Sequence, residues 1–148
     1  MRRIHVLRVE EEPEVFGPLL LAAAAAGLRI GWLELAAPPP PPEELRRALL
    51  AGGERAVAVG EGWTLSVRAR RGAPRLRELL RAQFAGCAAV LVRGQLGVVV
   101  GVEAPRLAPL AEGTWSVRAG ERERRLDTTA LVAALREPRP FPPAEPVR

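Results

Sequence analysis

The chain has 148 residues and a formal net charge of +5, and 48% of its residues are hydrophobic, so it can form a globular domain with a buried core. It has no Lys or Tyr, and only one His, one Cys and one Asp, so it offers few of the side chains with which enzymes transfer protons or attack substrates. The single Cys excludes an internal disulfide, and the missing Lys excludes a Gly-x-x-x-x-Gly-Lys phosphate loop.

Charge is unevenly distributed along the chain. Residues 1–65 contain 7 Arg and 9 Glu, a net charge of −2, whereas residues 66–148 contain 15 Arg and 8 acids, a net charge of +7. We therefore expect an acidic partner for the second half. The uncharged run 15–28 is too short to cross a bilayer, and residues 1–12 lack the apolar core of a signal peptide. These features predict a cytoplasmic protein without a membrane partner.

The excess of Ala, Arg, Gly and Pro has two explanations that the composition does not separate. These residues have GC-rich codons, so a high-GC genome accounts for them. The many Pro, with little Asn, Gln, Cys and Met, also suit a thermophile.

Apolar runs predict the strands. Residues 4–9 are apolar on both faces, which is typical of a central buried strand. Residues 63–70 alternate between apolar and polar, which is typical of a half-exposed antiparallel strand. The other strands are expected at 29–35, 56–59, 88–93, 98–102 and 115–119.

Helices are predicted at 18–26, 43–51, 74–85 and 128–136, with a short helical turn within 104–111. The helix at 18–26 begins at a Pro, which is favourable in a first turn, and it has no polar face. It must therefore be covered by the rest of the domain or by another subunit. Asp127 is expected to cap the last helix. Five Pro within residues 137–148 predict a disordered or extended tail.

The order of these elements predicts an α/β fold. We expect a single three-layer Rossmann-like or flavodoxin-like domain over residues 1–136, with a mixed sheet and added antiparallel hairpins. The strands at 4–9, 29–35 and 56–59 should be parallel, with right-handed crossovers. A similarity between residues 61–69 and 112–119 leaves an internal repeat open.

Ligands of open α/β sheets bind beyond the carboxyl ends of the strands, where this sequence places Glu10, Glu34 and Arg93. The loop after the first strand carries Glu10, Glu11, Glu12 and Glu14 instead of the glycines that approach a phosphate, so a dinucleotide is not expected. Glu10 and Glu34 could bind a divalent cation through oxygen, but a solvated acidic rim before a helix explains them more simply. We predict no metal and no cofactor.

Clustered arginines are the main positive signal. One group follows a strand into a helix: Arg68, Arg70, Arg71, Arg75, Arg77 and Arg81. A second group comprises Arg122, Arg124, Arg125, Arg136 and Arg139. Arg binds phosphate and carboxylate in bidentate fashion, so nucleic acid is a possible partner. No aromatic residues interleave with these arginines as in single-strand binders, which favours a solvated basic face.

His5 and Cys87 each precede or begin a strand, at the end opposite to the expected ligand edge. A partly buried His satisfied by the backbone, and a small buried thiol, explain them best. A Cys–His pair would need the two strands to be neighbours.

Three functional interpretations follow from these features. The first is a non-catalytic α/β module that docks onto a larger protein assembly or forms a homo-oligomer. The second is a nucleic-acid-associated protein that uses its arginines. The third is a small-ligand or enzymatic domain that uses Glu10, Glu34 and Arg93.

Overall fold

The computed structural model describes residues 3–35, 42–70, 72–94, 99 and 103–141. The chain divides into two compact units. The first unit comprises Met1–Ala37 and Pro74–Arg148, and the second unit comprises Pro38–Ala73.

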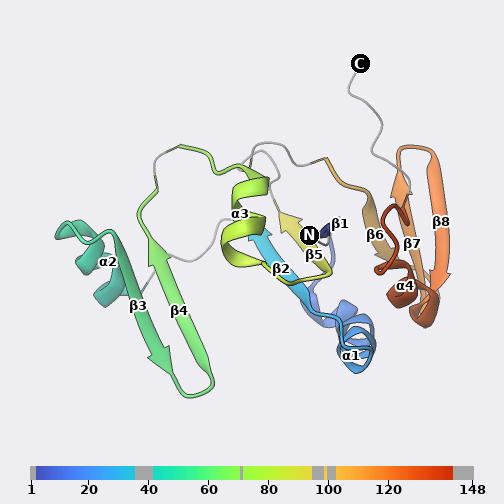
Figure 1. Ribbon diagram of the computed structural model, residues 1–148, viewed down its shortest axis with the longest axis horizontal. Helices are drawn as coiled ribbons and strands as arrows, with labels where there is room; N and C mark the ends of the chain where they lie inside the picture. Colours follow the sequence, from blue (N-terminus) through green and yellow to red (C-terminus); the bar gives the residue numbers. More distant parts are fainter. Residues whose placement is uncertain (1–2, 36–41, 71, 95–98, 100–102, 142–148) are drawn as a thin grey trace. The chain divides into compact units, whose positions relative to one another are not determined.

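A six-stranded mixed sheet forms the centre of the first unit, in the order β2-β5-β1-β6-β7-β8 (Figure 1). Its strands are β1 (His5–Val9), β2 (Ile30–Leu35), β5 (Ala89–Gly94), β6 (Arg106–Pro109), β7 (Thr114–Ala119) and β8 (Arg122–Asp127). The strands β2, β5, β1 and β6 are parallel, and β7 and β8 extend the sheet as antiparallel strands. The prediction of an α/β fold with a mixed sheet is confirmed.

Helices cover both faces of this sheet, which makes three layers. On one face, α1 (Gly17–Ala25) and α4 (Thr128–Ala134) enclose a core with Leu7 and Leu91. On the other face, α3 (Leu76–Gln83) packs over Val90 and Val92. Because β5 is buried on both faces, its sequence is a continuous apolar run, as is usual for a central parallel strand.

The start of α1 is shaped by the segment that follows β1. A 3-10 turn, η1 (Pro13–Phe16), buries Phe16, and α1 continues directly from it. Leu19 and Ala23 face the core, whereas Leu21 on the opposite side of this apolar helix is 75% exposed. At the start of α4, the Asp127 carboxylate accepts a hydrogen bond of 2.7 Å from the Ala130 amide, which confirms the predicted cap.

The second unit consists of α2 (Glu43–Leu50) and a hairpin of β3 (Arg55–Gly60) and β4 (Trp63–Arg68). Gly62 lies in the hairpin turn with φ of +80°, a conformation that favours glycine. Leu45 of α2 and Ala56 of β3 are buried. The alternation predicted for residues 63–70 holds in the middle of β4, where Leu65 and Val67 are half-buried and Ser66 is exposed, but Trp63, expected on the same face as Leu65, is 59% exposed.

Three expected elements differ from the structure. The segment at 56–59 is part of β3 and pairs antiparallel with β4, because a tight turn joins the two strands and a parallel pair would need a long crossover. The helical turn expected within 104–111 is the strand β6, and β8 was not expected at all. The strand expected at 98–102 lies outside the described residues except for Val99.

The predicted tail begins within the described part of the chain. Phe141 packs edge-on against His5, with 5.9 Å between the ring centroids. Residues 142–148 lie outside the described residues. The two similar segments at 61–69 and 112–119 contain β4 and β7, which pair differently, because β4 ends a two-stranded hairpin and β7 lies between two strands.

Candidate functional site at the carboxyl edge of the sheet

The strand register brings Glu10, Glu34 and Arg93 to the same edge of the sheet. Arg93 lies on β5 between its two parallel neighbours, level with Val9 of β1 and with Glu34 of β2. Glu10 follows Val9 directly. The three residues chosen from the sequence as a ligand set therefore share the carboxyl edge, where ligands of open α/β sheets bind.

Arg93 is held by the acidic loop that follows β1. Its two terminal nitrogens donate to the two carboxylate oxygens of Glu12 at 3.0 and 2.9 Å, a bidentate pair. The carboxylate of Glu34 lies 3.8 Å from Arg93 and accepts a hydrogen bond of 2.9 Å from the indole of Trp32. The hydrogen bond to Glu12 raises the pKa of Arg93 above its ordinary value against the opposing effect of burial, so this guanidinium stays charged.

A second arginine, Arg106, pairs with the remaining carboxylates of the loop. Its Nη2 atom lies 3.1 Å from a carboxylate oxygen of Glu10 and 3.1 Å from one of Glu11. The sequence did not suggest Arg106, because its surroundings, rich in Pro and Ala, predicted a helical turn. The available signal was the alternation of Arg106 and Leu107, which places Leu107 in the core and Arg106 at the edge.

These pairs determine the chemistry of the edge. The side chains in these ion pairs comprise four carboxylates and two guanidiniums, an excess of two negative charges, which disfavours phosphate. Both arginines of these pairs already bind the chain's own carboxylates. In the described part of the chain, no group of three or more His, Cys, Asp or Glu residues could hold a metal ion. The ion pairs at this edge fix the loop between β1 and η1.

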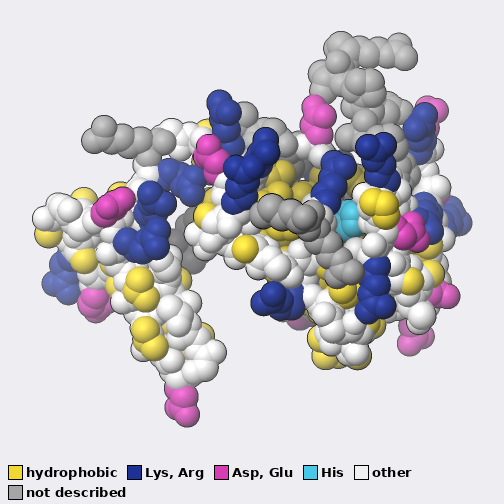
Figure 2. All heavy atoms as spheres, viewed as in Figure 1, with side chains coloured by type: hydrophobic (Ala, Val, Ile, Leu, Met, Phe, Trp, Pro, Cys, Tyr) yellow, Lys and Arg dark blue, Asp and Glu magenta, His cyan; other side chains and the backbone are white. Residues whose placement is uncertain are grey.

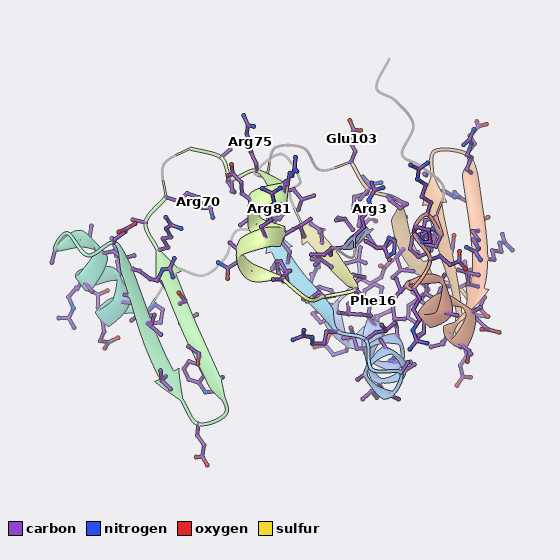
Figure 3. The ribbon with its side chains drawn as sticks, viewed as in Figure 1. Arg3, Phe16, Arg70, Arg75, Arg81 and Glu103 are labelled. Atoms are coloured by element: carbon purple, nitrogen blue, oxygen red, sulfur yellow. The ribbon has the colours of Figure 1, made fainter. Side chains whose placement is uncertain are left out.

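The first arginine group is divided between the two units. Arg68 and Arg70 belong to the second unit, whereas Arg75, Arg77 and Arg81 belong to α3 or its cap in the first unit. Figure 3 shows Arg75 and Arg81 at the two ends of α3. Arg68 lies 3.7 Å from Glu54. Arg71 lies outside the described residues.

The second arginine group mostly makes contacts within the first unit. Arg125 and the neighbouring Arg118 pair with Glu123 on β8, at 3.3 and 3.6 Å. Arg124 contacts Glu137, and the Arg136 guanidinium donates to the carbonyl of Ala26 at the end of α1. These contacts connect β8, α4 and α1, so these arginines have a structural role within the first unit.

His5 and Cys87 lie near the opposite, amino edge of the sheet, on different faces. His5 contacts Phe141, and burial lowers the pKa of His5, although hydrogen bonds to the backbone of Glu137 and Leu135 act in the opposite direction. Cys87 packs with the core on the α3 side. The Cys–His pair that the sequence left open is therefore not formed.

Comparisons with known proteins identify a similar structure but no family. No protein-family model and no curated protein matches the sequence. Among solved structures, the chain is similar to the crystal structure of Bacillus subtilis MobB, with 19% sequence identity and a TM-score of 0.47. The similarity covers 74% of this chain and 69% of that chain. Within the described residues, no helix has the length and apolar character needed to cross a membrane.

Proposed function

We propose that this chain is a non-catalytic α/β interaction module that docks onto a larger protein assembly through the outer face of the β3–β4 hairpin. The supporting observation is apolar side chains that the second unit leaves uncovered. On this face Val57 is 52% exposed and Val59 is 80% exposed. Figure 2 shows hydrophobic side chains on the surface of the hairpin. Neighbouring exposed apolar side chains rimmed by polar residues are typical of protein interaction sites.

The second unit is also too small to be stable by its own core. Among its described residues, Leu45 and Ala56 are the buried hydrophobic side chains. Domains shorter than about 40 residues usually need a disulfide, a metal or a partner, and a two-stranded hairpin alone is marginal in water. A partner that covers Val57 and Val59 would supply the missing apolar burial.

The charges on the outer face indicate the chemistry of this partner. Arg55 and Arg68 lie opposite each other on β3 and β4, on the same face as the two valines. The pair between Arg68 and Glu54 is exposed and 3.7 Å long, so it binds Arg68 only weakly. A protein surface with an apolar centre and an acidic rim fits this arrangement best.

The carboxyl edge of the first unit supports the same conclusion. The residues that would form a ligand site, Arg93 and Glu34, take part in the chain's own ion pairs. A small ligand would have to displace these carboxylates and would meet a net negative charge. This weakens the alternative of an enzyme at that edge.

The test is native mass spectrometry of the untagged protein isolated from its own cells, combined with variants of the hairpin. We expect a defined complex with a protein partner that is lost on Val57→Glu plus Val59→Glu, because two carboxylates would be buried without a counter-charge against the partner's apolar centre. Leu21→Glu is the matched control, since Leu21 is equally apolar and exposed but lies on α1.

Circular dichroism of both variants shows whether each still folds. A complex that survives the double substitution in a folded variant contradicts docking through this face. A monomer without any bound protein, at low and high salt, contradicts the docking function itself.

A second candidate function is nucleic-acid binding by α3 and its cap. In the described part of the chain, the exposed Arg75, Arg77 and Arg81 form no ion pair, unlike the arginines of β8. Binding through them should weaken steeply as salt increases. If charge reversal at Arg75 and Arg77 leaves the affinity for a nucleic acid unchanged, this surface does not bind it.

A further inference from the structure

A cavity of about 360 Å³ opens at the amino edge of the sheet in the first unit, at the end opposite to the ion pairs of Arg93. Its walls come from the residues that precede β1, β2 and β5 and from the last turn of α3. Ile4, Leu28 and Leu80 provide apolar walls, and the Cys87 side chain also lines the cavity. Neither the sequence patterns nor the proposed docking function accounts for this cavity.

Two arginines, Arg29 and Arg81, belong to the same lining. In the described part of the chain neither forms an ion pair, whereas the arginines at the carboxyl edge are held by carboxylates. Arg81 extends from the last turn of α3 (Figure 3). Among the described residues, the lining therefore combines apolar walls with two arginines and contains no acidic residue.

Gly86 allows Arg29 to lie against the cavity wall. Gly86 has φ of +85°, and a Cβ atom built there would overlap a terminal nitrogen of Arg29. A larger residue at this position would therefore displace the guanidinium. The backbone of Gly86 thus provides the space in which Arg29 reaches the cavity.

We propose that this cavity binds a small amphiphilic anion, whose apolar body contacts Ile4, Leu28 and Leu80 and whose anionic group is bound by Arg29 and Arg81. Ligand sites in proteins are usually apolar with a few polar groups that fix orientation, and this volume lies at the lower end of their range of about 300–1,000 Å³. Guanidinium groups bind carboxylate or phosphate oxygens through charge-assisted hydrogen bonds. The ligand class is therefore a carboxylate or phosphate on a short apolar body.

Cys87 makes the proposal directly measurable, since it is the one cysteine in the chain and lies in the cavity lining. Its alkylation by iodoacetamide can be followed by the intact mass of the full-length protein. Three compounds separate the two parts of the ligand: octanoate has both an apolar body and an anion, 1-octanol has the body alone, and inorganic phosphate has the anion alone. We expect octanoate to slow alkylation in a saturable way and to bind about tenfold more tightly than 1-octanol.

Variants assign the effect to particular side chains. Arg29→Gln plus Arg81→Gln should reduce the protection by octanoate to that by 1-octanol. Arg77→Gln is the matched control on α3, since Arg77 does not line the cavity, and it should leave the protection unchanged. Ala85→Leu places a larger side chain at an exposed position of the lining and so reduces the space in the cavity. It should weaken the protection by octanoate and by 1-octanol.

The proposal is overturned if octanoate and 1-octanol protect Cys87 equally, or if the double Arg variant keeps the octanoate effect. It is also overturned if no compound changes the rate. Protection by phosphate alone, equal to that by octanoate, would show an anion site without an apolar subsite and would contradict the amphiphilic ligand. None of these outcomes depends on the hairpin or its partner, so the docking function is tested separately.

Discussion

Replacing Phe16 by Ala should remove the centre of the largest core of the first unit. Phe16, labelled in Figure 3, is fully buried. Its ring stacks on that of Trp115 with a centroid distance of 5.7 Å and an interplanar angle of 21°. It also contacts Trp32 at 5.9 Å with a tilted geometry. One side chain therefore connects η1 to β2 and to β7.

The expected loss of stability follows from this packing. Truncating a buried Phe to Ala typically costs about 3–5 kcal/mol, and aromatic pairs contribute about 0.5–1.5 kcal/mol beyond burial. Because Phe16 has two such partners, we expect a loss in the upper part of this range, about 4–5 kcal/mol. With a urea dependence of about 2 kcal/mol per molar, the midpoint of unfolding should fall by about 2 M.

The assay is urea unfolding followed by tryptophan fluorescence in a Trp63→Phe background. Trp63 belongs to the second unit, so this background restricts the signal to Trp32 and Trp115, which both contact Phe16. Leu21→Ala is the control, because Leu21 is exposed and its truncation should change the midpoint little. A decrease of less than about 0.5 M for Phe16→Ala would refute the packing argument.

Three further predictions concern charged groups. A double-mutant cycle with Arg93→Gln and Glu12→Gln should give a favourable coupling free energy that is much smaller than the loss expected for Phe16→Ala and that decreases with added salt. Additive effects of the two substitutions would contradict the bidentate pair. The hydrogen bond from the Ser116 hydroxyl lowers the pKa of Glu123. The carboxylate therefore stabilises the fold at pH values above its unfolded pKa of about 4.3, and this stabilisation is lost as the pH falls through its folded pKa. Glu123→Gln should lower the Tm at pH 7 but not at pH 3. Burial lowers the pKa of His5, so the unfolded chain binds the proton more readily than the folded chain. The stability should therefore rise with pH up to about 6.5, measured as the Tm between pH 5 and 7. If His5→Gln leaves this dependence of the Tm on pH unchanged, another group is responsible for it.

The alternation and length of apolar runs were enough to predict the α/β class and most elements of the first unit. The helices began and ended within two residues of their predicted bounds, since Pro18 marks a helix start through its fixed backbone angle and Asp127 through its side-chain cap. Pairing was harder to predict. The apolar segment at 56–59 resembles a buried parallel strand, and its antiparallel pairing with β4 depends on the turn at Gly62.

The strand β8 shows why charged strands are missed. Its sequence Arg-Glu-Arg-Arg-Leu-Asp contains one large apolar residue, Leu126, and therefore lacks a hydrophobic period. The strand forms because Leu126 packs in the core and Glu123 accepts a hydrogen bond of 2.6 Å from Ser116 on β7. These contacts depend on a neighbouring strand, so a local sequence pattern could not predict them.

The carboxyl edge was predictable in position but not in its chemistry. Parallel strands necessarily bring their ends together, so Glu34 and Arg93 could be assigned to one edge from the sequence. Whether Arg93 faces a ligand or a carboxylate of its own chain depends on the path of the loop after β1. That path is set by burial of Phe16, which holds η1 against the sheet and places Glu12 opposite Arg93. Phe16→Ala should thus also loosen the Glu12–Arg93 pair. An anionic probe that still fails to bind at this edge in Phe16→Ala would show that the negative charge of the carboxylates excludes the anion. Occupation of Arg93 by Glu12 would then not be the main cause.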